Sequence, residues 1–163
     1  MWDRKVMLWG IALTLVFAIQ IIGAIIFYNY LDNADLTNLG WAVMAVSGVF
    51  GWLPIFTFRK RGGVPKGKSY VETTQLVDTG IYAIVRHPQY LAGILLSVAL
   101  MLIAPHWIVI LSGIVVLVIN YFSTVEEERT CIEQFGDAYR EYMNRVPRFN
   151  ALLGIVRWLR NTV

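Results

Sequence analysis

Three long apolar runs, separated by short polar segments, dominate the sequence. Residues 6–28 and 39–58 contain no charged side chain, and residues 91–125 contain only His106. Because a helix needs about 20 residues to cross a bilayer core of about 30 Å, each run is long enough to span a membrane. The first run is also longer than the apolar region of a signal peptide, about 7 to 15 residues, so we expect it to be a membrane span.

The third run is too long for one helix. Its middle contains Ala104, Pro105 and His106, and proline both removes a backbone donor and disfavours helix in the residue before it. Two helices joined by a tight turn therefore fit this run better than one. The pattern predicts an all-α membrane protein with about four transmembrane helices, the last two forming a hairpin. The expected spans are residues 6–28, 39–58, 88–104 and 107–125.

The composition agrees with a single integral membrane domain over residues 1–163. Hydrophobic residues make up 57% of the chain and charged residues 15%, which is too apolar for an ordinary soluble domain of this size. The single cysteine, Cys131, excludes an internal disulfide and a multi-cysteine metal site. The sequence therefore indicates no metal centre.

Lysines and arginines lie on one side of the predicted spans. They precede the first span, recur between the second and third, and follow the fourth, whereas residues 29–38 contain Asp32 and Asp35 and no base. By the positive-inside rule, both termini and the central connection are cytoplasmic. The net charge of +3 then reflects attraction to the membrane surface, and no aromatic-basic motif indicates nucleic-acid binding.

Two amphipathic segments follow the fourth span. In residues 125–146 apolar positions recur at spacings of three, four and seven, so we expect the fourth helix to continue out of the membrane. On that helix Glu128 falls inside the apolar stripe, whereas Glu127 lies on its flank. Residues 150–163 predict a shorter amphipathic helix on the membrane surface. Within the spans, we expect the two isolated amides to bond to other helices, namely Gln20 and Asn120.

Arg86 and His87 stand directly before an apolar helix, in the stretch RHPQYLAG. Taken alone, such a pair is most often a headgroup anchor. Pro88, however, suits the first turn of a helix, and the free amides at a helix N-terminus suit an anionic ligand group. The predicted hairpin returns Glu127 and Glu128 to the same cytoplasmic side, so these polar side chains are expected to lie together.

The stretches GIYAIVRHPQYLAG and EERTCIEQFGDAYREYMNRVPR resemble the membrane methyltransferases of the isoprenylcysteine carboxyl methyltransferase and phospholipid N-methyltransferase superfamily. The resemblance covers residues 60–149, which leaves residues 1–58 as two N-terminal spans and residues 150–163 as an amphipathic C-terminal segment. It implies an enzyme that uses S-adenosyl-L-methionine, held among the cytoplasmic ends of the last helices. The cofactor-binding residues that it implies are Gln75, Leu76, Val77, Tyr82, His87, Pro88, Gln89, Tyr90 and Glu127, with Glu128 beside it. The catalytic residues that it implies are His87, Glu127 and Arg86.

The substrate arginine of the prenylcysteine branch is missing here. That branch carries an arginine four residues before the first glutamate of the pair, where it meets the substrate carboxylate, and this position is Ser123. Arg86, Arg145 or Arg148 could serve instead. The resemblance favours a lipophilic acceptor, most like the carboxylate of a prenylated cysteine. A phospholipid amine and a small lipophilic thiol or acid are the alternatives.

Two other classes of function compete with a methyltransferase. A non-enzymatic membrane scaffold would use the arginines as anchors and leave the acids solvated, as is usual for a run such as EEER. A transporter would need charged residues or interrupted helices within the spans, and the spans contain no charged residue. If the protein is an enzyme, in-line methyl transfer needs no metal. Methylation of an amine would also require a base on the protein, and the candidates are His87 and the glutamates.

Overall fold

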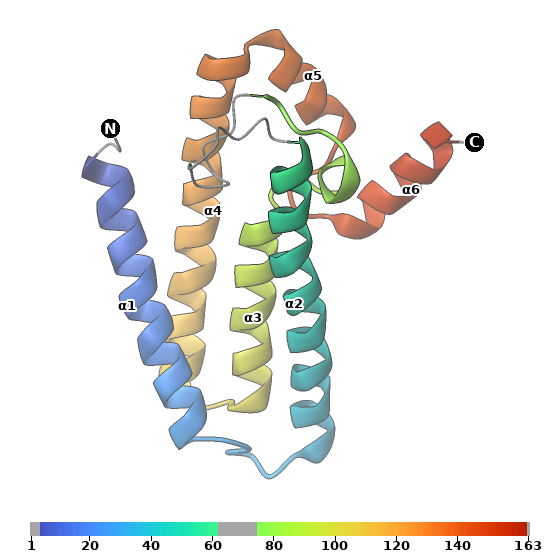
Figure 1. Ribbon diagram of the computed structural model, residues 1–163. Helices are drawn as coiled ribbons and strands as arrows, with labels where there is room; N and C mark the ends of the chain where they lie inside the picture. The colour runs from blue at the N-terminus through green and yellow to red at the C-terminus, as the bar shows by residue number, and fades with distance from the viewer. Residues whose placement is uncertain (1–3, 62–74, 163) are drawn as a thin grey trace. The chain divides into compact units, whose positions relative to one another are not determined.

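The computed structural model describes residues 4–61 and 75–162, and all the regular structure in these two ranges is helical (Figure 1). The expected all-α fold is therefore confirmed. The elements are α1 (Arg4–Ile26), α2 (Ala34–Arg61), the 3₁₀ turn η1 (Gly80–Ala83), α3 (Pro88–Ile103), α4 (Trp107–Phe135), α5 (Asp137–Arg145) and α6 (Ala151–Thr162). Lys66 and Lys68, two of the basic residues between the second and third predicted spans, lie outside the described residues.

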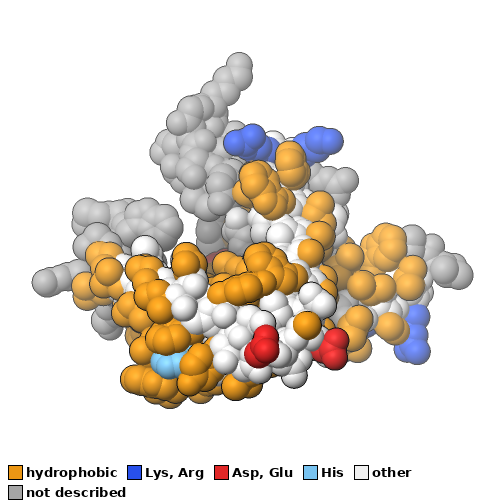
Figure 2. All heavy atoms as spheres, turned by 90° about the horizontal axis from the view of Figure 1, so that it is seen from below, with side chains coloured by type: hydrophobic (Ala, Val, Ile, Leu, Met, Phe, Trp, Pro, Cys, Tyr) orange, Lys and Arg blue, Asp and Glu red, His pale blue; other side chains and the backbone are white. Residues whose placement is uncertain are grey.

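Three of these helices, α1, α2 and α4, are long and apolar enough to cross a membrane. Helix α3 is equally apolar but has 16 residues, a length of about 24 Å at 1.5 Å per residue. Figure 2 shows the described residues from below, at the ends of the helices, where hydrophobic side chains lie beside acidic side chains and a histidine. Along the helices large apolar side chains point outward, as Leu15 and Ile25 do on α1. Such a surface suits lipid and not water, so the fold is that of an all-α membrane protein.

The helix ends differ from the hydropathy pattern at two places. Helix α2 begins at Ala34 and not near residue 39, because the Asn33 side chain caps it by accepting from the Leu36 backbone N–H at 3.0 Å. Helix α4 continues beyond the apolar run, as expected, but stops at Phe135. The expectation of one helix through residue 146 is wrong, because Gly136 takes a φ of 58°, which breaks the helix before α5.

The tight turn expected between the last two spans is present. Ala104, Pro105 and His106 alone connect α3 to α4, and the His106 N–H donates to the Ala104 carbonyl at 2.7 Å. The His106 ring stacks on Phe27 of α1, with 3.6 Å between ring centroids and 7° between ring planes. His106 therefore has a packing role at this turn.

The contacts divide the chain into two compact units. The first consists of Met1–Gly48 and Ala92–Glu126, and the second of Val49–Leu91 and Glu127–Val163. In the first unit the fully buried amide of Gln20 on α1 pairs with Ser97 on α3, donating to its carbonyl and accepting from its hydroxyl, both at 3.0 Å. The interhelical bond expected for Gln20 is confirmed. Asn120 instead donates to Val116 of its own helix at 2.9 Å, so that expectation is corrected.

Two glycines of α2 provide a matched test of helix packing in the first unit. A Cβ at Gly40 would stand 2.6 Å from Ile103 Cγ1 and 2.9 Å from the Ala99 carbonyl oxygen, whereas a Cβ at Gly48 would meet nothing within 4 Å. We expect Gly40→Ala to destabilise the protein by about 1–3 kcal/mol, because the backbone of α3 must shift. We expect Gly48→Ala to be neutral or slightly stabilising, because alanine favours a helix by about 1 kcal/mol over glycine.

The measurement is the thermal unfolding of both variants in the same detergent. Equal melting temperatures for Gly40→Ala and the wild type would contradict the close approach of α2 and α3.

Candidate active site

The site forms in the second unit, where the chain passes from η1 into α3. Val85 is fully buried, and Pro88, also buried, is the first residue of α3, as predicted. Between them the Arg86 N–H donates to the Pro147 carbonyl at 3.0 Å, and the His87 N–H to the Arg148 carbonyl at 3.4 Å. The segment that follows α5 therefore holds the backbone of both polar residues in place.

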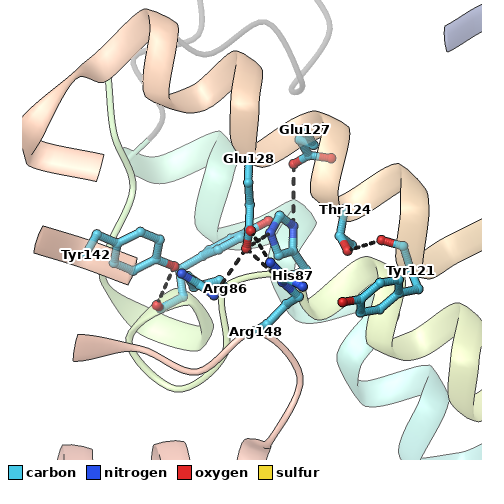
Figure 3. Close-up of polar contacts among 9 residues, drawn as sticks. Arg86, His87, Tyr121, Thr124, Glu127, Glu128, Tyr142 and Arg148 are labelled. Carbon is cyan, nitrogen blue, oxygen red and sulfur yellow. Dashed lines mark hydrogen bonds and ion pairs between the residues drawn. The ribbon is translucent and has the colours of Figure 1, made fainter. Parts of the chain in front are cut away.

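The buried carboxylate of Glu128 is the centre of the cluster (Figure 3). Its Oε1 lies 3.1 Å from His87 Nε2 and 3.2 Å from Arg86 Nη2. Arg148 adds a fork, in which Nε donates to Oε1 at 3.1 Å and Nη2 donates to Oε2. Because a carboxylate only accepts, His87 presents a hydrogen on Nε2. One carboxylate thus joins two guanidinium groups and an imidazole.

Glu127 is placed differently from its neighbour. Its side chain is 47% exposed, its Oε1 lies 3.7 Å from His87 Nδ1, and it interacts with the Tyr90 side chain. Glu128 is only 4% exposed. The predicted burial of Glu128 and the flanking position of Glu127 are both confirmed. Glu128 is not a solvated acid, while Glu127 keeps an open side.

Helix α5 supports the site from the side of η1. The Tyr142 hydroxyl donates to the Tyr82 carbonyl at 2.8 Å. Burial raises the pKa of the Tyr142 hydroxyl well above its ordinary value, and the nearby Arg86 opposes this only in part. The hydroxyl therefore remains a neutral donor over the physiological range, and the bond between α5 and η1 does not depend on pH there.

The structure brings some of the implied site residues together and gives others a packing role. Arg86, His87, Tyr90, Glu127 and Glu128 form one connected group. By contrast, three residues serve the packing around α5 and η1. Leu76 packs against the cluster of Tyr139, Tyr142 and Val146, Val77 is buried, and the buried ring of Tyr82 lies 4.7 Å from that of Phe58. Gln75 is exposed, and Gln89 is half-buried beside Pro88.

The role of Arg148 was missed at the level of the sequence. In the sequence Arg148 is a candidate cation for the substrate, whereas in the structure it pairs with Glu128. The only sequence signal was the motif VPR after the amphipathic helix. Its partner lies 20 residues earlier, on α4, while Arg148 lies in the segment between α5 and α6, so local periodicity carries no information about this pair.

Three apolar helices of membrane-spanning length, together with a buried polar cluster at the start of the shorter apolar helix α3, define an integral membrane protein with a candidate active site. The model of the phospholipid methyltransferase (PEMT) family matches residues 36–138, more than half of the chain, and the protein belongs to this family. The resemblance is thus confirmed. The match includes Arg86, His87, Glu127 and Glu128 but not Arg148. No individual curated protein matches the chain.

We expect the two adjacent glutamates to contribute to stability to very different extents. We expect Glu128→Gln to destabilise the protein by about 3–5 kcal/mol, because it leaves Arg86 and Arg148 without their shared carboxylate. We expect Glu127→Gln to cost less than about 1 kcal/mol, since its side chain is half exposed. Thermal unfolding of both variants in detergent measures the difference. Similar losses for the two variants would rule out Glu128 as the centre of the cluster.

Proposed function

We propose that the protein transfers a methyl group from S-adenosyl-L-methionine to a lipophilic acceptor that enters from the bilayer. Membership of a membrane methyltransferase family supports the reaction class. The observation that carries the proposal is the position of Glu127, an open carboxylate between His87 and Tyr90 and directly beside the buried anchor Glu128. This arrangement lies within the matched segment.

The side chains at the site fit the chemical groups of the cofactor. Glu127 can accept hydrogen bonds from an ammonium or a ribose hydroxyl, and the N–H groups near His87 can donate to a carboxylate. Tyr90 is half-buried and offers a ring for the adenine, whereas the ring of Tyr82 is already packed against Phe58. The cofactor, when bound, supplies a methyl group on a positively charged sulfur.

The task of the protein is then mainly to hold the reactants in line. Glu128 fixes the positions of Arg86 and His87 at the start of the apolar helix α3. A carboxylate acceptor needs no base, and its charge is neutralised as the methyl group moves, which a water-poor site favours. An amine acceptor must lose a proton, and Glu127 with His87 Nδ1 is the pair that can take it.

Three acceptor classes are candidates for this site. The first is the carboxylate of a prenylated cysteine, which the sequence motifs favour, and the second is the amine of a phospholipid, which the family fits equally. Small lipophilic thiols or acids form a third, simpler class. Incubation of the purified protein with labelled S-adenosylmethionine and one member of each class separates them by the product that becomes labelled.

Binding of S-adenosylhomocysteine to the purified protein in detergent tests the cofactor proposal. We expect Glu127→Gln to weaken binding by roughly tenfold to a hundredfold, because it removes the charged acceptor. Glu133→Gln changes an exposed acid on the same helix and serves as the matched control, with unchanged affinity. Calorimetry gives both values. If the wild type binds no S-adenosylhomocysteine at millimolar concentration, the proposed function is wrong.

The membrane orientation is part of the same proposal. The site and both termini face the cytoplasm, because the basic residues lie on that side and the connection between α1 and α2 carries Asp32 and Asp35. Helix α6 lies on the membrane surface there, with exposed apolar side chains toward the lipid. These side chains are Leu152, Leu153, Ile155, Val156 and Leu159. On its other side Gly154 lies so close to the Ile84 carbonyl that a Cβ would collide with it.

Alkaline phosphatase fusions in a bacterial host check this orientation, since the enzyme is active only outside the cytoplasm. We expect an active fusion in the connection between α1 and α2 and an inactive fusion after Val163. The reverse pattern would place the site on the opposite side of the membrane.

A further inference from the structure

Three arginines were candidates for the cation that Ser123 does not supply, and the structure gives them different surroundings. Arg148 already donates to both carboxylate oxygens of Glu128, through Nε and Nη2. Arg145 pairs with Asp78 at 3.1 Å on the surface, where its side chain is 59% exposed. Arg86 is the buried one of the three, with a side chain that is 8% exposed.

Arg86 uses only part of its hydrogen-bonding capacity within the protein. Its Nη2 lies 3.2 Å from Glu128, whereas its Nε and Nη1 are buried and have no partner among the described residues. Buried donors are nearly always paired, and a charged donor left unpaired carries a large desolvation penalty. The guanidinium therefore keeps two buried donors for an acceptor that the described residues do not provide.

The local charges favour an anionic acceptor. Two guanidinium groups, from Arg86 and Arg148, share the single buried carboxylate of Glu128. The second carboxylate, Glu127, is half exposed and faces His87 and Tyr90. The positive end of α3 begins two residues after Arg86, and it adds to the attraction for a negative group.

We propose that Arg86 binds a carboxylate or phosphate oxygen of the molecule that occupies this site. This inference rests on the proposed function and narrows the ligand class. The oxyanion has three sources there: the carboxylate of the cofactor, the carboxylate of a prenylated cysteine, and the phosphate of a phospholipid. The Arg86 backbone bond to Pro147 and its contact with Glu128 hold the guanidinium in one orientation, so little entropy is lost on binding.

Pairs of ligands, of which one member carries the oxyanion and the other lacks it, test this proposal and identify the source. The pairs are S-adenosylhomocysteine and its methyl ester, N-acetyl-S-farnesylcysteine and its amide, and dioleoyl phosphatidic acid and dioleoylglycerol. Affinities are measured by calorimetry on the full chain in an uncharged detergent. The variants are Arg86→Gln and, as a control, Arg140→Gln, which removes an exposed arginine that pairs with Asp137.

We expect the wild type to prefer the anionic member of at least one pair by roughly tenfold to a hundredfold. Arg86→Gln should abolish that preference and leave the affinity for the neutral member within about twofold, while Arg140→Gln should keep the preference. Equal weakening of both members by Arg86→Gln would assign Arg86 to structure alone and overturn the proposal. Absence of a charge preference in every pair would also overturn it.

A second measurement, by NMR on the wild type, tests the proposal if Arg86→Gln does not fold. The Nε–H resonance of Arg86 in the wild type, assigned by its loss in Arg86→Lys, should shift with the anionic member of a pair and not with the neutral one. A resonance that responds to neither would overturn the proposal. Failure of both S-adenosylhomocysteine and its ester to bind would instead contradict the proposed function, while the lipid pairs would still decide the role of Arg86.

Discussion

The rest of the site depends on the burial of one negative charge. A carboxylate as deeply buried as Glu128 is tolerated only with cations and hydrogen-bond donors around it, and the protein supplies Arg86, His87 and Arg148. These partners come from the linker before α3 and from the segment after α5. A single charge therefore fixes three stretches of chain that are far apart in the sequence.

Helix α4 directs the two adjacent glutamates differently, because successive residues of an α-helix point about 100° apart. With Glu128 directed inward, Glu127 is directed to the side, where it is half exposed and faces His87 and Tyr90. His87 touches both acids, with Nε2 on Glu128 and Nδ1 nearer Glu127. The rigid pairing on one side of the imidazole thus orients its other nitrogen toward the open carboxylate.

The sequence predicted those features that depend on local periodicity. The apolar runs predicted the helices, Pro88 predicted the start of α3, and the helical wheel predicted the burial of Glu128. Helix ends were less predictable, because they depend on single residues such as Asn33 and Gly136 and not on hydropathy. The partnership of Arg148 with Glu128 was not predictable, since it depends on how the chain turns back after α5.

The positions of the cations have a consequence for the choice of acceptor. Ser123 lacks the positive charge that the prenylcysteine branch carries there, but Arg86 has two buried donors that none of residues 4–61 and 75–162 pairs with. If Arg86 takes the place of the arginine missing at Ser123, the site still suits an acceptor with an oxyanion. Both a prenylcysteine and a phospholipid contain such a group. The two classes then differ in proton chemistry, because only an amine acceptor must lose a proton. Glu127 beside His87 Nδ1 is the pair open to that role, so methylation of an amine would depend on these two side chains as a base and methylation of a carboxylate would not.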